Sequence, residues 1–341
     1  MTMDENPNLN PIADTAVRPP DDPKDRLSPR RSILAPPKGA ATGALAIFWN
    51  EHDLRAGWRL AIFAALVFCM ASGGTALVVI LHLPIVTRAA ITPGAILTQE
   101  CIMLLATLVA TSIMGLLERR AFGTYGLPGH DAFRANFWHG AGWGIAIISA
   151  TMLLLRIFGG FSFGTLALRP ASACGYAILW GVVFLSVGFL EEFLFRGYAQ
   201  FTLTTGLGFW PAASILSAMF GALHLGNGGE DYAGAVSVFV VGMFFCLTLR
   251  RTGNLWLAVG LHTAFDWGET FLFSVPNSGI VAPGHLLNSS LHGPTWLTGG
   301  SVGPEGSVMV FIVLGVAAGI FSRVYLPHTD DRAHIEGREE S

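Results

Sequence analysis

Long apolar runs constrain this chain more than any other feature of its sequence. Eight of them are each close to the roughly 20 residues that a helix needs to cross a bilayer. Backbone polar groups in lipid must be hydrogen-bonded within the protein, so such runs indicate helices, and the alternating pattern of a membrane barrel is missing. The runs lie near 57–82, 94–117, 137–158, 174–199, 209–225, 233–249, 254–274 and 307–326. The sequence therefore predicts an all-α, polytopic membrane helix bundle of about eight transmembrane helices.

Composition agrees with a membrane protein. Hydrophobic residues make up 52% of the chain and charged residues only 13%, whereas soluble domains carry roughly 25% charged residues. A single large soluble core is disfavoured, because soluble helices rarely run this far without charge. The net charge of −3 gives no reason to expect nucleic acid as a partner. The lipid bilayer is the partner that the composition predicts.

The chain divides into three parts by composition. Residues 1–50 are rich in Pro, Asp, Asn and Arg, which predicts a disordered tail. This polar segment is too long to be a cleaved signal peptide before the first apolar run. Residues 51–326 form the predicted transmembrane helical domain, and residues 327–341 form a charged C-terminal tail.

Positive charges gather in alternate loops. With eight spans, most loop Arg and Lys residues fall on one side, which the positive-inside rule assigns to the cytoplasm. Both termini are then predicted to be cytoplasmic, and the Gly-, Pro- and Ser-rich segment 275–306 lies outside. We expect that segment to be a solvated loop, with a lid as the alternative. The residues that set this orientation are Arg30, Arg31, Lys38, Arg55, Arg59, Arg119, Arg120, Arg134, Arg250, Arg251 and Arg323.

Ionisable residues inside a bilayer are costly, so they tend to face a protein interior and to serve a function. Charges near the ends of spans are better explained by side chains that reach back to the membrane surface. We place His139, Arg156 and Glu100 in that group. Three other clusters lie within apolar runs, and they are the candidate functional residues.

The first cluster is in the fourth run, where Glu191, Glu192 and Arg196 interrupt an apolar segment. Glu192 and Arg196 are four residues apart, so they share a helix face and can pair. Glu191 is turned about 100° from Glu192 and can point into a cavity. A buried Glu–Arg pair with a purely structural role is the alternative, but one arginine does not easily neutralise two carboxylates.

The second and third clusters supply histidines. His224 lies late in the fifth run, and alone it is typical of a hydrogen-bonded core histidine. In the seventh run His262, Asp266 and Glu269 follow i, i+4, i+7 spacing, so they form one polar stripe along a helix. A charged stripe facing lipid is too costly, so we expect it to face a wet cavity.

Together the clusters predict an active-site cavity within the bilayer. At 1.5 Å per residue, Glu191 and His262 both come out about 13 Å deep, and His224 somewhat deeper. A buried carboxylate beside a histidine is suited to activating water, and a second polar pair can stabilise an oxyanion. The chain has no Gly-x-Ser-x-Gly and no His-Glu-x-x-His.

At these segments the sequence resembles the CPBP family of intramembrane proteases. This family contains type II CAAX prenyl endopeptidases and their bacterial bacteriocin-processing and immunity relatives. Its motifs occur here in order, each in its own span, over roughly residues 175–275. They stand as Glu191-Glu192-Phe-Leu-Phe-Arg196, Phe220-Gly-Ala-Leu-His224 and His262-Thr-Ala-Phe-Asp266.

The resemblance implies an intramembrane glutamate-dependent endopeptidase that hydrolyses a membrane-associated protein or peptide in a bacterial cell membrane. Glu191 and His224 would activate water, and His262 and Asp266 would bind the oxyanion or position substrate. Glu192 and Arg196 would organise the site.

One position departs from the family pattern. Asp266 stands where prenyl endopeptidases have Asn, and an ionised Asp cannot donate a hydrogen bond to an oxyanion. It would have to be protonated, orient His262 or help to hold a metal.

The cofactor is left open by the sequence. Either none is required, or a divalent metal such as zinc binds Glu191, His224 and His262 in a metalloprotease. Two other functions also stay open. One is a non-catalytic scaffold or immunity-type protein of the same fold, and the other is a transporter with the polar stripe as an ion relay. Product cleavage distinguishes the peptidase from both.

Overall fold

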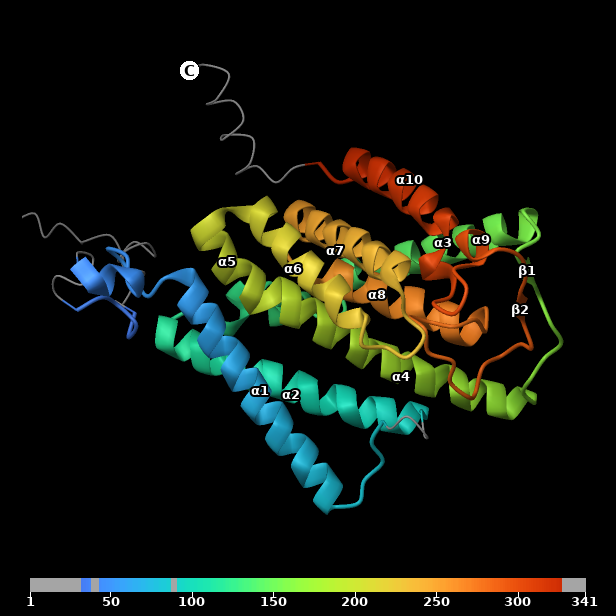
Figure 1. Cartoon of the computed structure of the whole chain (residues 1–341), viewed down its shortest axis with the longest axis horizontal. Helices are drawn as coiled ribbons and strands as arrows, with labels where there is room; N and C mark the ends of the chain where they lie inside the picture. Colours follow the sequence, from blue (N-terminus) through green and yellow to red (C-terminus); the bar gives the residue numbers. More distant parts are fainter. Residues whose placement is uncertain (1–31, 38–42, 87–90, 327–341) are drawn as a thin grey trace, which may run out of the picture.

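The computed structural model of the protein describes residues 32–37, 43–86 and 91–326. Within them the chain is almost entirely helical, with one short two-stranded sheet (Figure 1). The α-helices are α1 (Ala56–Ile80), α2 (Pro93–Glu118), α3 (Ala135–Ile157), α4 (Pro170–Leu194), α5 (Gln200–Leu207), α6 (Phe209–His224), α7 (Tyr232–Thr252), α8 (Trp256–Trp267), α9 (Thr295–Thr298) and α10 (Val308–Val324). Two π-helical turns, η5 (Phe195–Ala199) and η6 (Gly268–Leu272), extend α4 and α8. The remaining elements are the 3-10 turns η2 (Gly43–Ile47), η3 (Phe122–Tyr125), η4 (Gly129–Asp131) and η7 (Pro304–Gly306) and the strands β1 (Phe161–Ser162) and β2 (Ser290–Leu291).

Each predicted span coincides with one of these helices. The fourth differs most, because α4 continues through η5 into α5 as one apolar unit over Pro170–Leu207. Helix ends follow local signals: Thr92 accepts from the Ala95 N–H at the start of α2, and Asp231 accepts from the N–H groups of Ala233 and Gly234 at the start of α7. At the end of α7, Gly253 takes a left-handed conformation with φ 76°.

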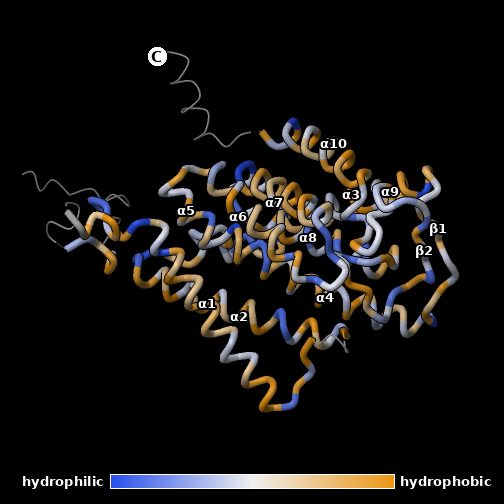
Figure 2. The backbone as a smooth tube through the Cα atoms, in the orientation of Figure 1, coloured by the Kyte–Doolittle hydropathy of each residue, from blue (hydrophilic) through white to orange (hydrophobic). Residues whose placement is uncertain are grey.

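Apolar side chains cover the outside of the bundle. In the part of the chain that the structure describes, five helical units are long and apolar enough to cross a membrane by length and composition, and α10 is a shorter apolar helix. Figure 2 shows hydrophobic residues along the outer helices α1, α2 and α10. Large apolar side chains point outward from several of the long helices, among them Phe68, Leu116, Trp138, Ile178 and Leu223. The fold is therefore an all-α polytopic membrane bundle, as the sequence predicts.

Helix α8 lies at the centre of the bundle. It packs along α3 and α4 and also contacts α7, while α2 packs on α4, α1 on α2 and α6 on α7. Helix α10 closes one side against α3 and α7 (Figure 1). Because α8 carries His262 and α4 carries Glu191, this arrangement brings two of the sequence clusters to one interface.

Glycines allow α3 and α8 to pack backbone against backbone. A side chain added at Gly140 or Gly144 of α3 would overlap the carbonyl groups of Leu257 and Leu261 in α8. A side chain at Gly260 of α8 would overlap the carbonyl group of Phe137. Small residues at such contacts are how helices associate closely in membranes.

The N-terminal segment differs from its prediction where the structure describes it. A disordered tail is predicted over residues 1–50, yet residues 32–37 and 43–50 contact the bundle. The Ile33 N–H donates to Leu117 O of α2 at 2.9 Å, and the Trp58 indole of α1 donates to Ile47 O at 3.1 Å. The described part of this segment is mostly apolar, with Ile33, Leu34, Ile47, Phe48 and Trp49, unlike the polar stretch that precedes it. The predicted tails over residues 1–31 and 327–341 lie outside the described residues.

The segment 275–306 is more ordered than a solvated loop. Its strand β2 pairs antiparallel with β1, and Val275, Ala282 and Val302 are buried. The segment folds back over one end of the bundle (Figure 1). It contributes side chains to the central cavity described below.

Candidate active site

The Glu-Glu pair lies at the end of α4, where the helix passes into the π-helical turn η5. Glu192 is fully buried, and its Oε1 accepts from Nη1 of Arg196 at 3.3 Å. Arg196 sits inside η5, and the next residue, Gly197, has the non-helical ψ of −123°. π-helical turns often occur at functional sites. Here the turn contains the motif residue Arg196 and begins shortly after Glu192.

Aromatic rings surround the Arg196 guanidinium. Its Cζ lies 4.4 Å from the ring centre of Phe220 and 5.4 Å from that of Phe245. A cation over an aromatic face is favourable, the more so when it is buried. Gly242 of α7 provides space for the guanidinium, because a side chain there would overlap Nη2 of Arg196.

His262 lies among three carboxylates. Its Nδ1 is 3.0 Å from Oε1 of Glu192, and its Nε2 is 3.5 Å from both Oε2 of Glu191 and Oδ2 of Asp266. The ring stacks on Phe245 with centroids 5.1 Å apart. A carboxylate only accepts hydrogen bonds, so this ring is placed to donate from Nδ1 toward Glu192. Its other nitrogen faces Glu191 and Asp266.

A cavity of about 290 Å³ opens beside these residues. Glu191, His224, His262 and Asp266 all line it. The Glu191 side chain is 24% exposed, whereas that of Glu192 is 0% exposed. The two neighbouring carboxylates therefore have different surroundings, and Glu191 is the one that water in the cavity can reach.

His224 ends α6 on the wall of the same cavity. Its Nδ1 lies 2.8 Å from Phe220 O. Because a carbonyl oxygen only accepts, Nδ1 carries a hydrogen and Nε2 has a free lone pair when the ring is neutral. In the described part of the chain His224 makes no hydrogen bond or ion pair with Glu191, whose near neighbour is His262.

Glu100 of α2 lines the cavity, whereas its sequence position predicts a side chain at the end of a span. Its Oε2 is buried without a hydrogen-bond partner. Its position well inside the apolar run 94–117 was the available signal, since charge there usually faces a protein interior.

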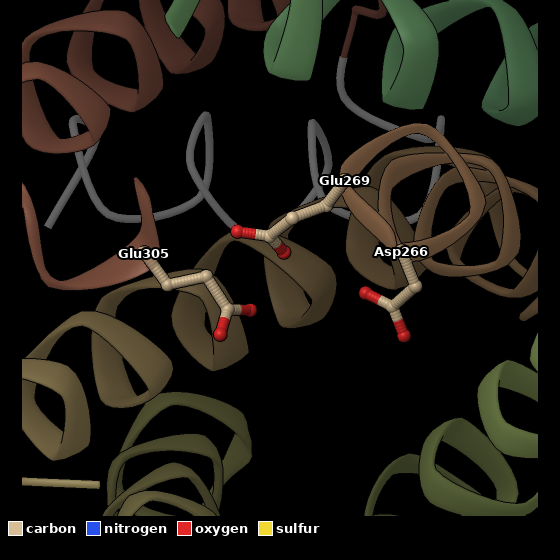
Figure 3. A group of neighbouring side chains, drawn as sticks. All are labelled: Asp266, Glu269 and Glu305. Carbon is tan, nitrogen blue, oxygen red and sulfur yellow. The ribbon is translucent and has the colours of Figure 1, made fainter. Parts of the chain in front are cut away.

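The predicted metal ligands are only partly brought together. Glu191 and His262 are neighbours, but Glu191, His224 and His262 do not form a group whose ligand atoms all lie within 4.8 Å. Their donor types suit zinc, yet this spacing does not, so we derive no step through a metal at these residues. Among the described residues the group that meets this spacing is Asp266, Glu269 and Glu305 (Figure 3).

Comparison with known proteins supports the resemblance seen in the motifs. Residues 173–268 match the family model described as type II CAAX prenyl endopeptidase Rce1-like. The match runs from the start of α4 to the start of η6 and includes all three motifs. No curated protein and no solved structure matched the chain. Residues 173–268 are thus similar to the Rce1-like type II CAAX prenyl endopeptidases, which agrees with the CPBP resemblance of the motifs.

Proposed function

We propose that this protein is an intramembrane glutamate-dependent endopeptidase that hydrolyses a peptide bond by activating water. One observation carries the proposal. Glu191 reaches the cavity with its Oε2 3.5 Å from Nε2 of His262, while the adjacent Glu192 is buried against Arg196. One carboxylate is therefore available for chemistry, and its neighbour holds the site in place.

In this mechanism Glu191 is the general base. A water molecule in the cavity gives a proton to Glu191 as its oxygen attacks the carbonyl carbon of the substrate. The His224 Nε2 lone pair accepts the second hydrogen of that water and orients it. The attack produces a tetrahedral intermediate with a negatively charged oxygen. Glu191 then returns its proton to the leaving amine as the C–N bond breaks.

His262 is the proposed oxyanion donor. In this scheme His262 carries a proton on both ring nitrogens. Glu192 accepts from Nδ1, which fixes the plane of the ring and directs the Nε2–H toward the cavity. A pre-oriented donor of this kind stabilises charge that develops during the reaction. Asp266, whose Oδ2 is 3.5 Å from Nε2, is a positioning residue in this scheme. It keeps the ring turned toward the cavity.

The cavity walls favour a substrate held within the membrane. Apolar side chains from α2, α4 and α7 line much of the space, including Ile96, Trp180, Phe184, Val241 and Phe244. We propose that the substrate is an extended segment of a membrane-associated protein or peptide, in a multi-pass bacterial membrane enzyme with both termini cytoplasmic.

A cleavage assay tests this function. Protein purified in detergent is mixed with a panel of quenched fluorescent peptides that includes a farnesylated CAAX peptide. Cleavage by the wild type that is lost in both Glu191→Ala and His224→Ala supports the proposal. A chelator series on the active protein then tests metal dependence.

A non-catalytic scaffold or immunity-type protein is the second candidate. Asp266 favours it, because an acidic residue replaces the family's neutral amide beside His262. A folded wild type that cleaves none of the peptides, with intact helices by circular dichroism, would favour this function over the peptidase.

A further inference from the structure

Three carboxylates from two separate parts of the chain meet at one end of α8. Asp266 lies in α8, Glu269 in the following turn η6, and Glu305 in η7 just before α10. One oxygen from each lies within 4.8 Å of the others. Figure 3 shows the carboxylates turned toward a shared space, with Glu305 approaching from its own segment.

Glu269 supplies a separate reason to expect a ligand. Its side chain is fully buried, and no hydrogen bond of 3.5 Å or less reaches either carboxylate oxygen, although the Glu305 backbone N–H lies nearby. Burial of a polar group without a partner is costly, and burial of an isolated charge is far more so. A bound cation would satisfy both oxygens at once.

Two hydrogen bonds hold the Glu305 carboxylate in place at the cluster. Its Oε2 accepts from the Ser278 N–H at 2.8 Å and from the Ser278 hydroxyl at 2.7 Å. These bonds fix the carboxylate while leaving its other oxygen free to bind. Asp266 and Glu305 both line the central cavity, which gives an ion and its water ligands a route to the site.

The donor set selects the class of ion. Carboxylate oxygens are ligands for hard cations, and neither a thiolate nor an imidazole belongs to this group. Ca²⁺ takes about six to eight oxygen ligands in flexible geometry, whereas Mg²⁺ needs a near-ideal octahedron and usually keeps several waters. Three carboxylates from separate segments therefore suit Ca²⁺ better than Mg²⁺.

We propose that Asp266, Glu269 and Glu305 bind a divalent cation of the calcium type. The ion would join the segment 275–306 to the end of α8 and neutralise the carboxylates there. Because Asp266 also lies 3.5 Å from Nε2 of His262, the ion would change the charge that faces the proposed oxyanion donor. Glu269 and Glu305 lie beyond the family match, which ends at residue 268.

Calcium binding to the full-length protein tests the site. Protein in detergent is stripped with a chelator and titrated with Ca²⁺ by calorimetry, and its thermal unfolding is followed with and without Ca²⁺. We expect one Ca²⁺ per chain and a raised unfolding temperature. Glu269→Gln and Glu305→Gln should each weaken binding at least about 10-fold and remove the thermal shift. Glutamine keeps the size of the side chain and removes charge, so at least one variant should fold.

Two further variants make the result specific. Glu51→Gln, at an exposed position, and Glu191→Gln, at the proposed base, should bind Ca²⁺ like the wild type. The proposal is overturned if folded wild type shows neither binding heat nor a thermal shift, or if both site variants bind normally. Equal loss of binding in Glu191→Gln would also overturn it, by placing the ion at the catalytic motif. No substrate is needed, so the outcome is independent of the peptidase proposal.

Discussion

Nδ1 of His262 lies 3.0 Å from Oε1 of Glu192, the oxygen that also accepts from Nη1 of Arg196 at 3.3 Å. One buried carboxylate thus joins the end of α4 to the middle of α8. Glu192 is fully buried, whereas Glu191 is open to the cavity. The pair therefore divides into a carboxylate that positions other groups and one that can react.

Replacing Glu192 should damage stability as well as activity. In Glu192→Gln the buried Arg196 loses its charged partner, and breaking a buried pair in this way costs roughly 3 to 5 kcal/mol. We expect a clearly lower midpoint of thermal unfolding and little cleavage. Glu191→Gln is the matched control, because its partly exposed side chain should leave the midpoint nearly unchanged. Equal thermal stability of the two variants would contradict the assignment.

Gly242 should be required for the position of Arg196. In Gly242→Ala the new methyl group overlaps Nη2 of Arg196 and lies 2.9 Å from Oγ of Ser217, so the guanidinium must shift. We expect lower thermal stability, by about 1 to 3 kcal/mol as for other overpacked sites, and reduced cleavage. Gly181→Ala is the control, since nothing lies within 4 Å of an added Cβ there. Identical behaviour of the two variants would show that Arg196 is not confined.

A second buried network supports η5 from the other side. Glu118 of α2 accepts from Tyr198 at 2.5 Å and from Tyr125 at 3.0 Å. Arg59 of α1 lies 3.4 Å from the same carboxylate and donates to Thr205 at 2.7 Å. These contacts attach α1 and α2 to the segment that follows Arg196.

Removal of the Tyr198 hydroxyl should therefore loosen η5. Tyr198→Phe loses a hydrogen bond to a buried carboxylate, and such bonds contribute about 1.5 to 3 kcal/mol. We expect thermal stability to fall by about that amount and the cleavage rate to fall with it. Tyr232→Phe serves as the control because Tyr232 is 81% exposed. If Tyr198→Phe retained wild-type stability, the network would have no anchoring role.

The loop before α7 should respond to pH. Burial, and secondly the nearby Glu305 carboxylate, raise the pKa of Glu230 from 4.5 to about 7. Between pH 4.5 and about 7 the folded state holds a proton that the unfolded state has released. The contribution of Glu230 to the free energy of unfolding is therefore complete below pH 4.5 and is lost as pH rises through about 7.

Thermal unfolding measured across pH checks this dependence. The difference in midpoint between wild type and Glu230→Gln should decline from about pH 4.5 to 7 and stay constant above that range. Subtracting the unfolding midpoint of the variant from that of the wild type removes the contributions of the other carboxylates. A difference that rises with pH in this window would contradict the assignment.

Helical periodicity was enough to predict the local geometry of the site. The i, i+4 spacing of Glu192 with Arg196 and of His262 with Asp266 predicts two neighbouring pairs, and both are ion pairs in the structure. Glu191 was expected to point away from its neighbour, and it lines the cavity. These relationships depend only on the rise and turn of a helix, which a sequence specifies directly.

Helical spacing does not predict contacts between segments that are distant in the sequence. Glu305 meets Asp266 because the segment 275–306 folds back over α8, and no local pattern encodes that return. The apolar run around Glu100 predicted a helix but not which face meets the cavity. The pairing of Glu191 with His224 came from the family resemblance. In the structure both line one cavity, and the near neighbour of Glu191 is His262.

The most direct test of the account compares kcat/KM of wild type and Glu191→Gln on one cleaved peptide, with Glu51→Gln as a control for a lost surface carboxylate. The general-base role predicts a fall of about 10² to 10⁴-fold in Glu191→Gln, with thermal stability and the Glu51→Gln rate unchanged. A Glu191→Gln protein that is folded and cleaves within about 3-fold of wild type, well short of that range, would contradict it.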